Sequence, residues 1–315
     1  MAAAPPWSPA ARGCGLRVAV DEVLMDPKSA LSEVLRATPG WQPGAAEAAT
    51  VSQVSGAMTN LVYHCTTPGP ATDNSAVIVR VFGSGGKLFS QKDERNIFLL
   101  ASQLGVGPRC LVEFANGRVE EFLPGDNLSS ASMRRPEVSA AIAAAMAAFH
   151  TRMLARLPAA QHAGSSGNGA AAAALRPAIY ERIRQWHAAA AEVCGAELAQ
   201  LGLTNVPVEL AELEAQIAAR FPSWVGFCHN DLQYGNMLLF GAGGSCSSGN
   251  AGGPSAVDGQ AAAAVALGTA VEVKLIDYEY STLNDVAFDV ANHFCEWAYN
   301  YHSGGCCCAL AVHPS

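Results

Sequence analysis

The sequence predicts an α+β fold of two lobes, the first rich in strands and the second mainly helical. Three observations favour this fold. Residues 51–122 hold short β-prone runs that are separated by turn signals. Helical periodicity takes over after Pro124-Gly125. Two segments rich in Gly, Ala and Ser, at 159–174 and 241–270, interrupt the second lobe. They are expected to be disordered, because they carry too few large apolar side chains to offset the entropy of ordering.

The first lobe is assigned to residues 27–123, behind an Ala- and Pro-rich tail at 1–26 that is expected to be disordered. A helix is expected at 91–104, because apolar residues recur there at helical spacing and a glycine follows. Asn116-Gly117 is the strongest short signal for a β-hairpin. Strands are expected at residues 51–54, 61–66, 77–82, 110–114 and 118–122.

The second lobe is assigned to residues 124–302, and an irregular tail follows at 303–315. Within 137–153, apolar side chains recur every three or four residues, which is typical of an amphipathic helix. Further helices are expected near 175–193, 208–221 and 286–299, and two short strands at 237–240 and 271–276.

Composition and charge argue against several classes of protein. A net charge of −8 and a pI near 5.5 argue against nucleic acid as a partner, because phosphate backbones are bound by basic surfaces. No run of 18 or more residues is apolar enough to span a bilayer. The cysteines form no C-x-x-C pair, which indicates reduced thiols and predicts a cytoplasmic protein.

Residues 227–236 carry the pattern H-x-D-x-x-x-x-N, which is the catalytic-loop spacing of the protein-kinase-like fold. In this pattern Asp231 accepts or orients the proton of an attacking hydroxyl, and Asn236 turns back to bind Mg²⁺. A second metal-binding carboxylate is expected after a hydrophobic strand, and Asp277 has that position. Once the 241–270 segment is set aside, the flanking strands form a hairpin that brings Asn236 and Asp277 together. The arrangement implies ATP and Mg²⁺ as cofactors.

The first lobe is expected to supply the nucleotide contacts. A turn at 55–60 can cover the phosphates with backbone N–H groups. Arg80 on the third strand and Glu94 on the following helix have the positions of an ion pair that binds the α- and β-phosphates. The alternative interpretation makes Arg80 a surface charge and Glu94 a solvated helix acid. The end of the 118–122 strand is placed to bind adenine through backbone groups. The nucleotide-binding residues expected in this lobe are therefore Gly56, Asn60, Arg80, Glu94, Glu121 and Leu123.

Other segments accompany the catalytic loop in order along the chain. They are Gly56-Ala57-Met58-Thr59-Asn60, Val79-Arg80-Val81-Phe82-Gly83, Gly117-Arg118-Val119-Glu120-Glu121-Phe122, Ile276-Asp277-Tyr278-Glu279-Tyr280, Phe288-Asp289 and Asn292-His293-Phe294-Cys295-Glu296-Trp297. Together they resemble the choline/ethanolamine kinase family, and its plant and algal members in particular, from about residue 51 to residue 301. Aminoglycoside phosphotransferases share the fold and the H-x-D spacing but are not expected to carry N-H-F-C-E-W.

The resemblance implies a protein-kinase-like fold that binds Mg·ATP between its lobes and transfers the γ-phosphate directly to choline. It implies that Asp231 is the catalytic base and that Asn236 and Asp277 hold Mg²⁺. Carboxylates and aromatic faces suit a quaternary ammonium, which has no N–H to donate. The amino-alcohol pocket implied by the resemblance is lined by Gln233, Tyr280, Glu296 and Tyr301. The resemblance is also compatible with a homodimer.

The end of the sequence departs from the family. Family members continue well beyond the N-H-F-C-E-W helix, whereas this chain ends fourteen residues after Tyr301. We therefore expect a chain truncated at its C-terminus, with an incomplete amine pocket and apolar surface left uncovered. Two alternatives stay open at this point: ethanolamine as the substrate, and a non-catalytic isoform that binds nucleotide or an intact partner.

Overall fold

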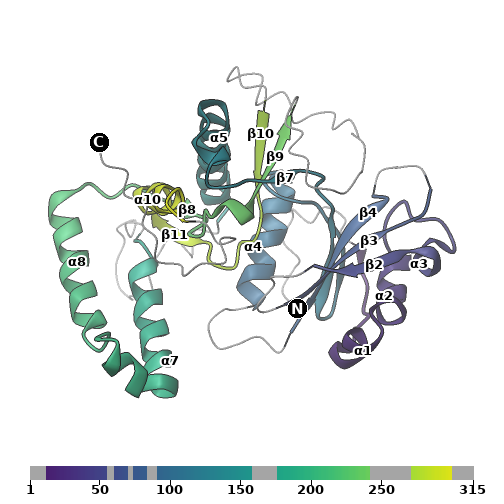
Figure 1. The fold of residues 1–315 in the computed structure, drawn as a ribbon, viewed down its shortest axis with the longest axis horizontal. Coiled ribbons are helices and arrows are strands. Elements are labelled where there is room, and N and C mark those ends of the chain that lie inside the picture. Colours follow the sequence, from purple (N-terminus) through teal and green to yellow (C-terminus); the bar gives the residue numbers. More distant parts are fainter. Residues whose placement is uncertain are drawn as a thin grey trace, which may run out of the picture. The chain divides into compact units, whose positions relative to one another are not determined.

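The computed structural model describes residues 12–54, 60–69, 74–83, 91–157, 176–241 and 271–299 (Figure 1). These residues group into two compact units. Of the described residues, unit 1 contains those up to 83, 91–126, 238–241 and 271–276, and unit 2 contains 127–157, 176–237 and 277–299. The boundary after Asp126 lies close to the one expected after Leu123. The strands that flank the 241–270 segment group with unit 1, although the sequence placed them in the second lobe.

Unit 1 is built on a mainly antiparallel sheet. In the described part of the chain six strands form it, in the order β1-β5-β6-β4-β3-β2, and β1 runs parallel to β5. The strands are β1 (Arg12–Gly13), β2 (Thr50–Gln53), β3 (Asn60–Thr66), β4 (Ala76–Phe82), β5 (Cys110–Phe114) and β6 (Gly117–Glu121). The predicted hairpin joins β5 to β6. Gly117 is required there, because an added Cβ would lie 2.3 Å from the carbonyl oxygen of Arg80.

The expectation of a disordered tail through residue 26 is wrong for residues 12–26. This segment forms β1 and helix α1 (Val20–Met25), and helices α2 (Pro27–Arg36) and α3 (Ala45–Ala48) follow. Val18 and Val23 are buried in the core of unit 1. Asn116 also binds the backbone of Val18 twice: its Oδ1 accepts from the Val18 amide at 3.0 Å, and its Nδ2 donates to the Val18 carbonyl oxygen at 2.7 Å. The apolar contacts that order the segment come from residues far along the chain, which the local Ala and Pro content does not reveal.

Alternation along β4 sorts its side chains between the two faces of the sheet. Val77, Val79 and Val81 belong to the core that includes residues of α1 and α2. Arg80 therefore points to the opposite face. It lies in register with Arg118 of β6, so both arginines share that face. Helix α4 (Gln91–Gln103) meets this face.

Unit 2 contains the helices predicted after residue 136, with small differences at their ends. Its elements are η1 (Ser132–Arg134), α5 (Pro136–Leu154), α7 (Ile179–Gln200), α8 (Val206–Arg220), β8 (Val225–Cys228), η2 (Tyr234–Asn236), β11 (Thr282–Asp285) and α10 (Val286–Glu296). The apolar stripe predicted on α5 is buried, from Val138 to Met153. β11 pairs antiparallel with β8, and both helices α5 and α10 pack on β8.

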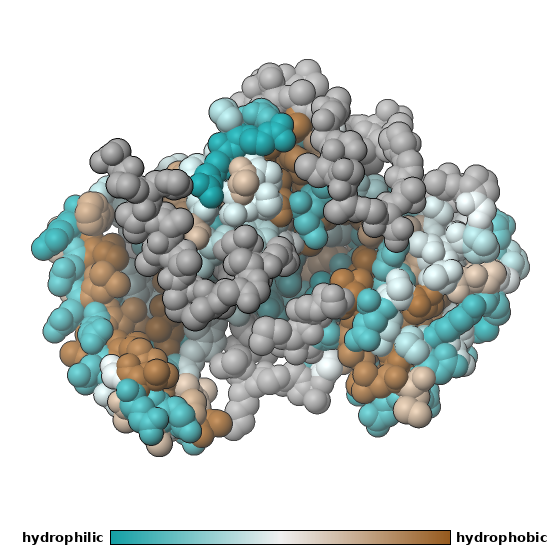
Figure 2. Space-filling model, in the orientation of Figure 1, coloured by the Kyte–Doolittle hydropathy of each residue, from teal (hydrophilic) through white to brown (hydrophobic). Residues whose placement is uncertain are grey.

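A third small sheet has the order β10-β9-β7, with β7 (Asp126–Asn127), β9 (Met237–Gly241) and β10 (Val271–Leu275). β9 and β10 are neighbours, as expected for strands that flank the 241–270 segment. Within the described ranges, no helix combines the length and apolar character needed to cross a membrane. Apolar side chains gather on α7 and α8 at the surface (Figure 2), including Val193, Val208 and Leu213.

Candidate active site

The H-x-D-x-x-x-x-N segment forms the connection between β8 and β9. The side-chain amide of Asn236, in η2, donates to Asp231 Oδ2 at 2.7 Å and to the Asp231 carbonyl oxygen at 3.0 Å. Asn230 and Asp277 both adopt left-handed backbone conformations, with φ of 65° and 67°. Such conformations cost roughly 1–3 kcal/mol each and cluster at functional sites. The residues predicted for catalysis therefore lie in a strained and hydrogen-bonded segment.

Asp231 lies in an environment that disfavours its negative charge. Burial raises its pKa above the ordinary value, and the nearby charge of Asp277 raises it further. His229 and hydrogen bonds from Asn236 and Gln233 lower the pKa, without cancelling the effect of burial. The two carboxylates are near enough to repel each other, and a divalent cation relieves such repulsion. Carboxylate and amide oxygens are ligands that suit Mg²⁺, so this group of residues fits the predicted metal site.

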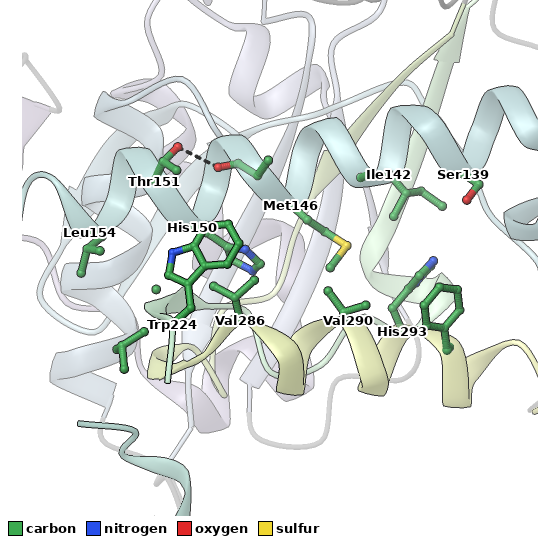
Figure 3. Close-up of a pocket in the computed structure, with 15 residues that line it drawn as sticks. Ser139, Ile142, Met146, His150, Thr151, Leu154, Trp224, Val286, Val290 and His293 are labelled. Carbon is green, nitrogen blue, oxygen red and sulfur yellow. Dashed lines mark hydrogen bonds between the residues drawn. The ribbon is translucent and has the colours of Figure 1, made fainter. Parts of the chain in front are cut away.

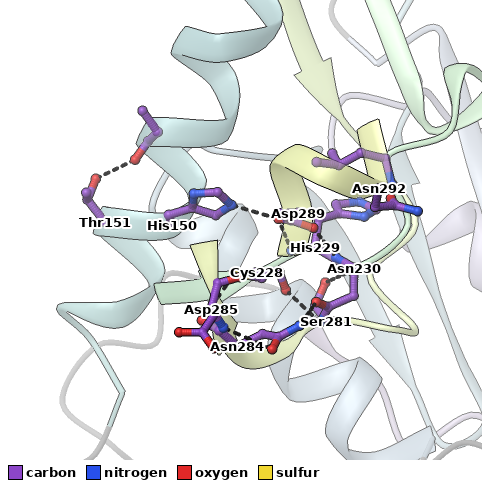
Figure 4. Close-up of polar contacts among 12 residues, drawn as sticks. His150, Thr151, Cys228, His229, Asn230, Ser281, Asn284, Asp285, Asp289 and Asn292 are labelled. Carbon is purple, nitrogen blue, oxygen red and sulfur yellow. Dashed lines mark hydrogen bonds and ion pairs between the residues drawn. The ribbon is translucent and has the colours of Figure 1, made fainter. Parts of the chain in front are cut away.

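Helix α10 holds the catalytic loop by its backbone, through Asp289 (Figure 4). Asp289 Oδ2 accepts from the His229 amide at 2.8 Å, and Oδ1 accepts from the Asn230 amide at 2.7 Å. His150 Nε2 of α5 lies 2.7 Å from Oδ2 of the same carboxylate. Asp289 is fully buried, and each of its oxygens has a partner, as a buried charge requires. We call this arrangement the Asp289 clamp.

Asn292 extends the clamp past Asp231. Its Oδ1 accepts from the Leu232 amide at 2.8 Å. Asp289 and Asn292 lie three positions apart on one face of α10, so the helix binds backbone amides on both sides of Asp231. Both residues belong to the segments that resemble the family, but neither is among the predicted site residues. Their spacing on one helix face was the signal that could have pointed to them.

Asn230 ties the loop to the segment that follows Asp277 (Figure 4). Its side chain donates to the Tyr280 carbonyl oxygen at 3.0 Å and accepts from Asn284 Nδ2 at 2.8 Å. The hydroxyl of Ser281 donates to the His229 carbonyl oxygen at 3.3 Å. The segments that carry Asp231 and Asp277 are thus bound together by the side chains of neighbouring residues, namely Asn230, Ser281 and Asn284.

Ligand atoms of His150, Cys228 and Asp289 lie within 4.8 Å of one another, which is a spacing that a metal ion could bridge. The chemistry does not fit a metal. Both oxygens of Asp289 already accept hydrogen bonds. Burial raises the pKa of the Cys228 thiol strongly, whereas a metal ligand must be a thiolate. The cluster is therefore a packed support for the catalytic loop.

A pocket of about 280 Å³ opens between α5, β8 and α10 (Figure 3). Its walls are mainly apolar, with Met146 of α5 facing Val286 and Val290 of α10. His150 lines it and also contacts Asp289. The described residues that line the pocket include none of the predicted site residues, so it is separate from the candidate active site.

In unit 1 the predicted phosphate-binding residues Arg80 and Glu94 each have a charged partner that was not predicted. The carboxylate of Glu94 is bound by Arg118, whose two terminal nitrogens lie 2.8 and 2.7 Å from its oxygens. Arg80 Nε donates to Glu120 Oε1 at 3.0 Å. Register accounts for the partner of Glu94, because Arg118 lies directly opposite Arg80 on the same face of the sheet. Arg118 and Glu120 were not predicted as site residues.

The remaining nucleotide-binding candidates of unit 1 lie along the sheet. Asn60 begins β3, in register with Phe82 at the end of β4. The Glu121 amide donates to the Arg109 carbonyl oxygen at 2.9 Å, and its side chain forms an ion pair with Arg109 at 3.1 Å. Leu123 is buried just beyond β6. Gly56 lies outside the described residues.

The candidate substrate residues lie in unit 2. Gln233 forms a hydrogen bond with Asp231. The ring of Tyr280 makes an edge contact with Trp186, with centroids 5.8 Å apart, and burial raises the pKa of Tyr280. Glu296 is buried at the end of α10. Tyr301 lies outside the described residues.

The sequence model for choline/ethanolamine kinase matches residues 51–308 of this chain. The chain belongs to the choline/ethanolamine kinase family. It is 35% identical over 263 residues to probable choline kinase 2 of Arabidopsis thaliana, with 82% of this chain and 61% of the relative covered. Probable choline kinase 3 of the same plant is 33% identical over 261 residues, with 82% and 62% covered. The chain therefore spans about three fifths of the length of these relatives.

Solved structures confirm the predicted α+β, protein-kinase-like fold of this choline/ethanolamine kinase family member. Choline kinase from Cryptosporidium parvum matches with a TM-score of 0.63 at 21% identity, over 88% of this chain and 70% of its own. An ethanolamine kinase from Plasmodium vivax matches with a TM-score of 0.62 at 18% identity, over 88% and 68%. At these identities the similarity shows the fold.

Proposed function

We propose that the protein is a kinase that uses ATP and Mg²⁺ to phosphorylate choline. The observation that carries this proposal is the group formed by Asp231, Asn236 and Asp277, on segments that the Asp289 clamp and Asn230 hold in place. Because the chain belongs to the choline/ethanolamine kinase family, we take this group of residues as the site of phosphoryl transfer to an amino alcohol.

Asp231 is the proton acceptor of the proposed reaction. A pKa raised by burial moves its carboxylate closer to the range in which a base accepts a proton efficiently. The choline hydroxyl loses its proton toward Asp231 as its oxygen bonds to the γ-phosphorus and the bond to the ADP oxygen breaks. ATP supplies the phosphoryl group, and Mg²⁺, when bound, would neutralise part of the negative charge of the phosphates. Asn236 and Asp277 are the residues that hold the metal.

The catalytic loop between β8 and β9 contributes to catalysis because its backbone is held in place before substrate binds. The amides of His229, Asn230 and Leu232 already bind Asp289 and Asn292, so these three hydrogen bonds do not have to form during the reaction. Positioning and preorganised charge supply most of the catalysis in phosphoryl transfer. In unit 1 we assign phosphate binding to Arg80 and adenine binding to the backbone around Glu121 and Leu123.

The amine end of the substrate needs a carboxylate and aromatic faces. Tyr280 and Trp186 form an aromatic pair in unit 2, and Glu296 adds a carboxylate. Each aromatic face in contact with a quaternary ammonium contributes about 0.5–2 kcal/mol. Gln233 and Tyr301 complete the pocket that the family resemblance implies. Ethanolamine is the second candidate substrate, because the family description includes it.

The test is ATP-dependent phosphorylation of choline and ethanolamine by the purified chain, with Asp231→Ala and Asp231→Asn as variants. Asp21→Ala is the control, since Asp21 is an exposed acid on α1. We expect kcat to fall by roughly 10²–10⁴-fold in both Asp231 variants, as for the loss of a general base, with little change in ATP affinity. An equal loss of ATP affinity would contradict the role given to Asp231. A wild-type chain that binds Mg·ATP but forms no product would instead support a non-catalytic protein.

We also propose a reducing, cytoplasmic location, because the cysteines that the structure describes are all free thiols. A homodimer is proposed on the resemblance alone. Cell fractionation and light scattering test these two proposals.

A further inference from the structure

Arg118 is the most deeply buried cation that the structure describes in unit 1, with a side chain only 2% exposed. Its Nε donates to Glu120 Oε1 at 2.8 Å, and its terminal nitrogens bind both oxygens of Glu94. Its guanidinium also lies over the Phe98 ring, 3.7 Å from the centroid. A buried charge is tolerated only when it is paired and hydrogen-bonded, and Arg118 meets both conditions.

Arg80 is connected to this centre through one oxygen. Glu120 Oε1 accepts from Arg118 Nε and also from Arg80 Nε, at 2.8 and 3.0 Å. The two arginines lie opposite each other on β4 and β6, where like charges repel. The carboxylate of Glu120 offsets this repulsion. Burial raises the pKa of Glu120, but the charges of Arg118 and Arg80 lower it below its ordinary value, so Glu120 stays charged.

We infer that Arg118 is a positioning residue for nucleotide binding. It fixes Glu94 and Glu120, and Glu120 in turn fixes the direction of the Arg80 guanidinium. The ion pair expected directly between Arg80 and Glu94 is thereby supplemented by a relay, in which Glu94 holds Arg118, Arg118 holds Glu120, and Glu120 holds Arg80. This inference rests on the proposed function, because it takes Arg80 as a phosphate ligand.

The chemistry of the relay requires arginine at position 118. One planar guanidinium binds Glu94 by two parallel hydrogen bonds and Glu120 by a third nitrogen, while its face covers Phe98. A lysine keeps the charge but is a point donor, and it cannot reproduce this fork. Arg118→Lys therefore removes the positioning while it keeps a cation in the core.

The experiment compares the wild type, Arg118→Lys, Arg80→Met and the double variant. Arg95→Lys is the matched control, because Arg95 also pairs an α4 residue with the sheet, through Glu113, but it is more than a third exposed. Two readouts are used. The first is the dissociation constant of Mg·ATP together with KM and kcat. The second is the Nε–H resonance of Arg80 in the NMR spectrum without nucleotide, which reports its bond to Glu120 whatever the activity.

We expect Arg118→Lys to weaken Mg·ATP binding about tenfold or more, which corresponds to one charge-assisted hydrogen bond, with a smaller change in kcat. On the Arg80→Met background the same substitution should change affinity little, because coupled residues do not add. The Arg80 Nε–H resonance should shift or broaden in Arg118→Lys and stay unchanged in Arg95→Lys.

Two results would overturn the inference. One is an unchanged Arg80 resonance in Arg118→Lys. The other is independence of the two substitutions: the loss of Mg·ATP affinity in the double variant would equal the product of the losses in Arg118→Lys and Arg80→Met. That result is expected if Arg118 only stabilises the fold. If the wild type forms no phosphocholine or binds no Mg·ATP, the proposed function fails. The Arg80 resonance then still decides whether Arg118 positions Arg80.

Discussion

In each unit, among the residues that the structure describes, a fully buried charged side chain lies at the centre of a network of polar contacts, and the two side chains have different kinds of partner. In unit 1 the charge is Arg118, and its hydrogen-bond partners are the side chains of Glu94 and Glu120. In unit 2 the charge is Asp289, and it binds the backbone amides of the catalytic loop together with one side chain, His150. The first centre orders side chains, and the second orders a segment of main chain.

This difference predicts how each centre fails. Side chains that lose a partner can adjust, because carboxylates take up protons when burial without a counter-charge becomes too costly. Backbone amides have no such response, so they stay unpaired or the loop moves. Loss of Asp289 should therefore be more damaging than loss of Arg118.

The largest effect is expected for Asp289→Ala. The substitution leaves the His229 and Asn230 amides and the His150 ring without their shared partner. Each buried polar group that loses its partner costs roughly 1–3 kcal/mol of stability, so the three groups together cost several kcal/mol. We expect a loss of that size in urea unfolding, faster hydrogen exchange at the two amides, and a loss of kinase activity. Asp289→Asn, which keeps one acceptor oxygen, serves as the intermediate case. Exchange rates at His229 and Asn230 that match the wild type would show that the clamp does not hold the loop.

A smaller and pH-dependent effect is expected for Arg118→Met. In the wild type the charges of Arg118 and Arg80 lower the pKa of Glu120 in spite of its burial. Its contribution to stability is therefore present above the unfolded pKa, near 4.5, and is lost as pH falls through the lower folded pKa. Without Arg118, burial dominates and the folded pKa of Glu120 rises. The free energy of unfolding of the variant is therefore lowered most, relative to wild type, at neutral pH.

The stability difference between wild type and Arg118→Met should accordingly be about 2–3 kcal/mol near pH 7, from the loss of buried charged hydrogen bonds, and should shrink toward pH 4.5. Urea unfolding over this pH range measures it. Asp289→Ala, measured over the same pH range, provides the comparison with a centre that binds main chain. A difference for Arg118→Met that is constant with pH would contradict the idea that Glu120 responds by taking up a proton.

The two centres also show how far the sequence could predict this protein. The α+β fold, the β5–β6 hairpin and the helices of unit 2 follow from periodicity and turn residues, which are local properties. The partner of Glu94 is not a local property, because it depends on which arginine of the sheet the register brings to α4. A weaker signal was present, since charged Arg118 and Glu120 flank buried Val119 on a central strand. That alternation places two charges on one face and calls for partners there.

The smallest expected effect concerns the edge of the Asp289 clamp, at Asn292. Its Oδ1 accepts one hydrogen bond, from the partly buried Leu232 amide at 2.8 Å. Asn292→Ala should cost about 1 kcal/mol of stability, the usual contribution of one neutral hydrogen bond. Asn292→Asp keeps an acceptor oxygen at the same place and should recover most of the loss in both stability and kcat. If alanine and aspartate were equally impaired, Asn292 would act by packing alone, and Asp289 and its neighbours would hold the loop without it. If only alanine is impaired, α10 fixes the main chain on both sides of Asp231, and the clamp of unit 2 acts as one continuous backbone support.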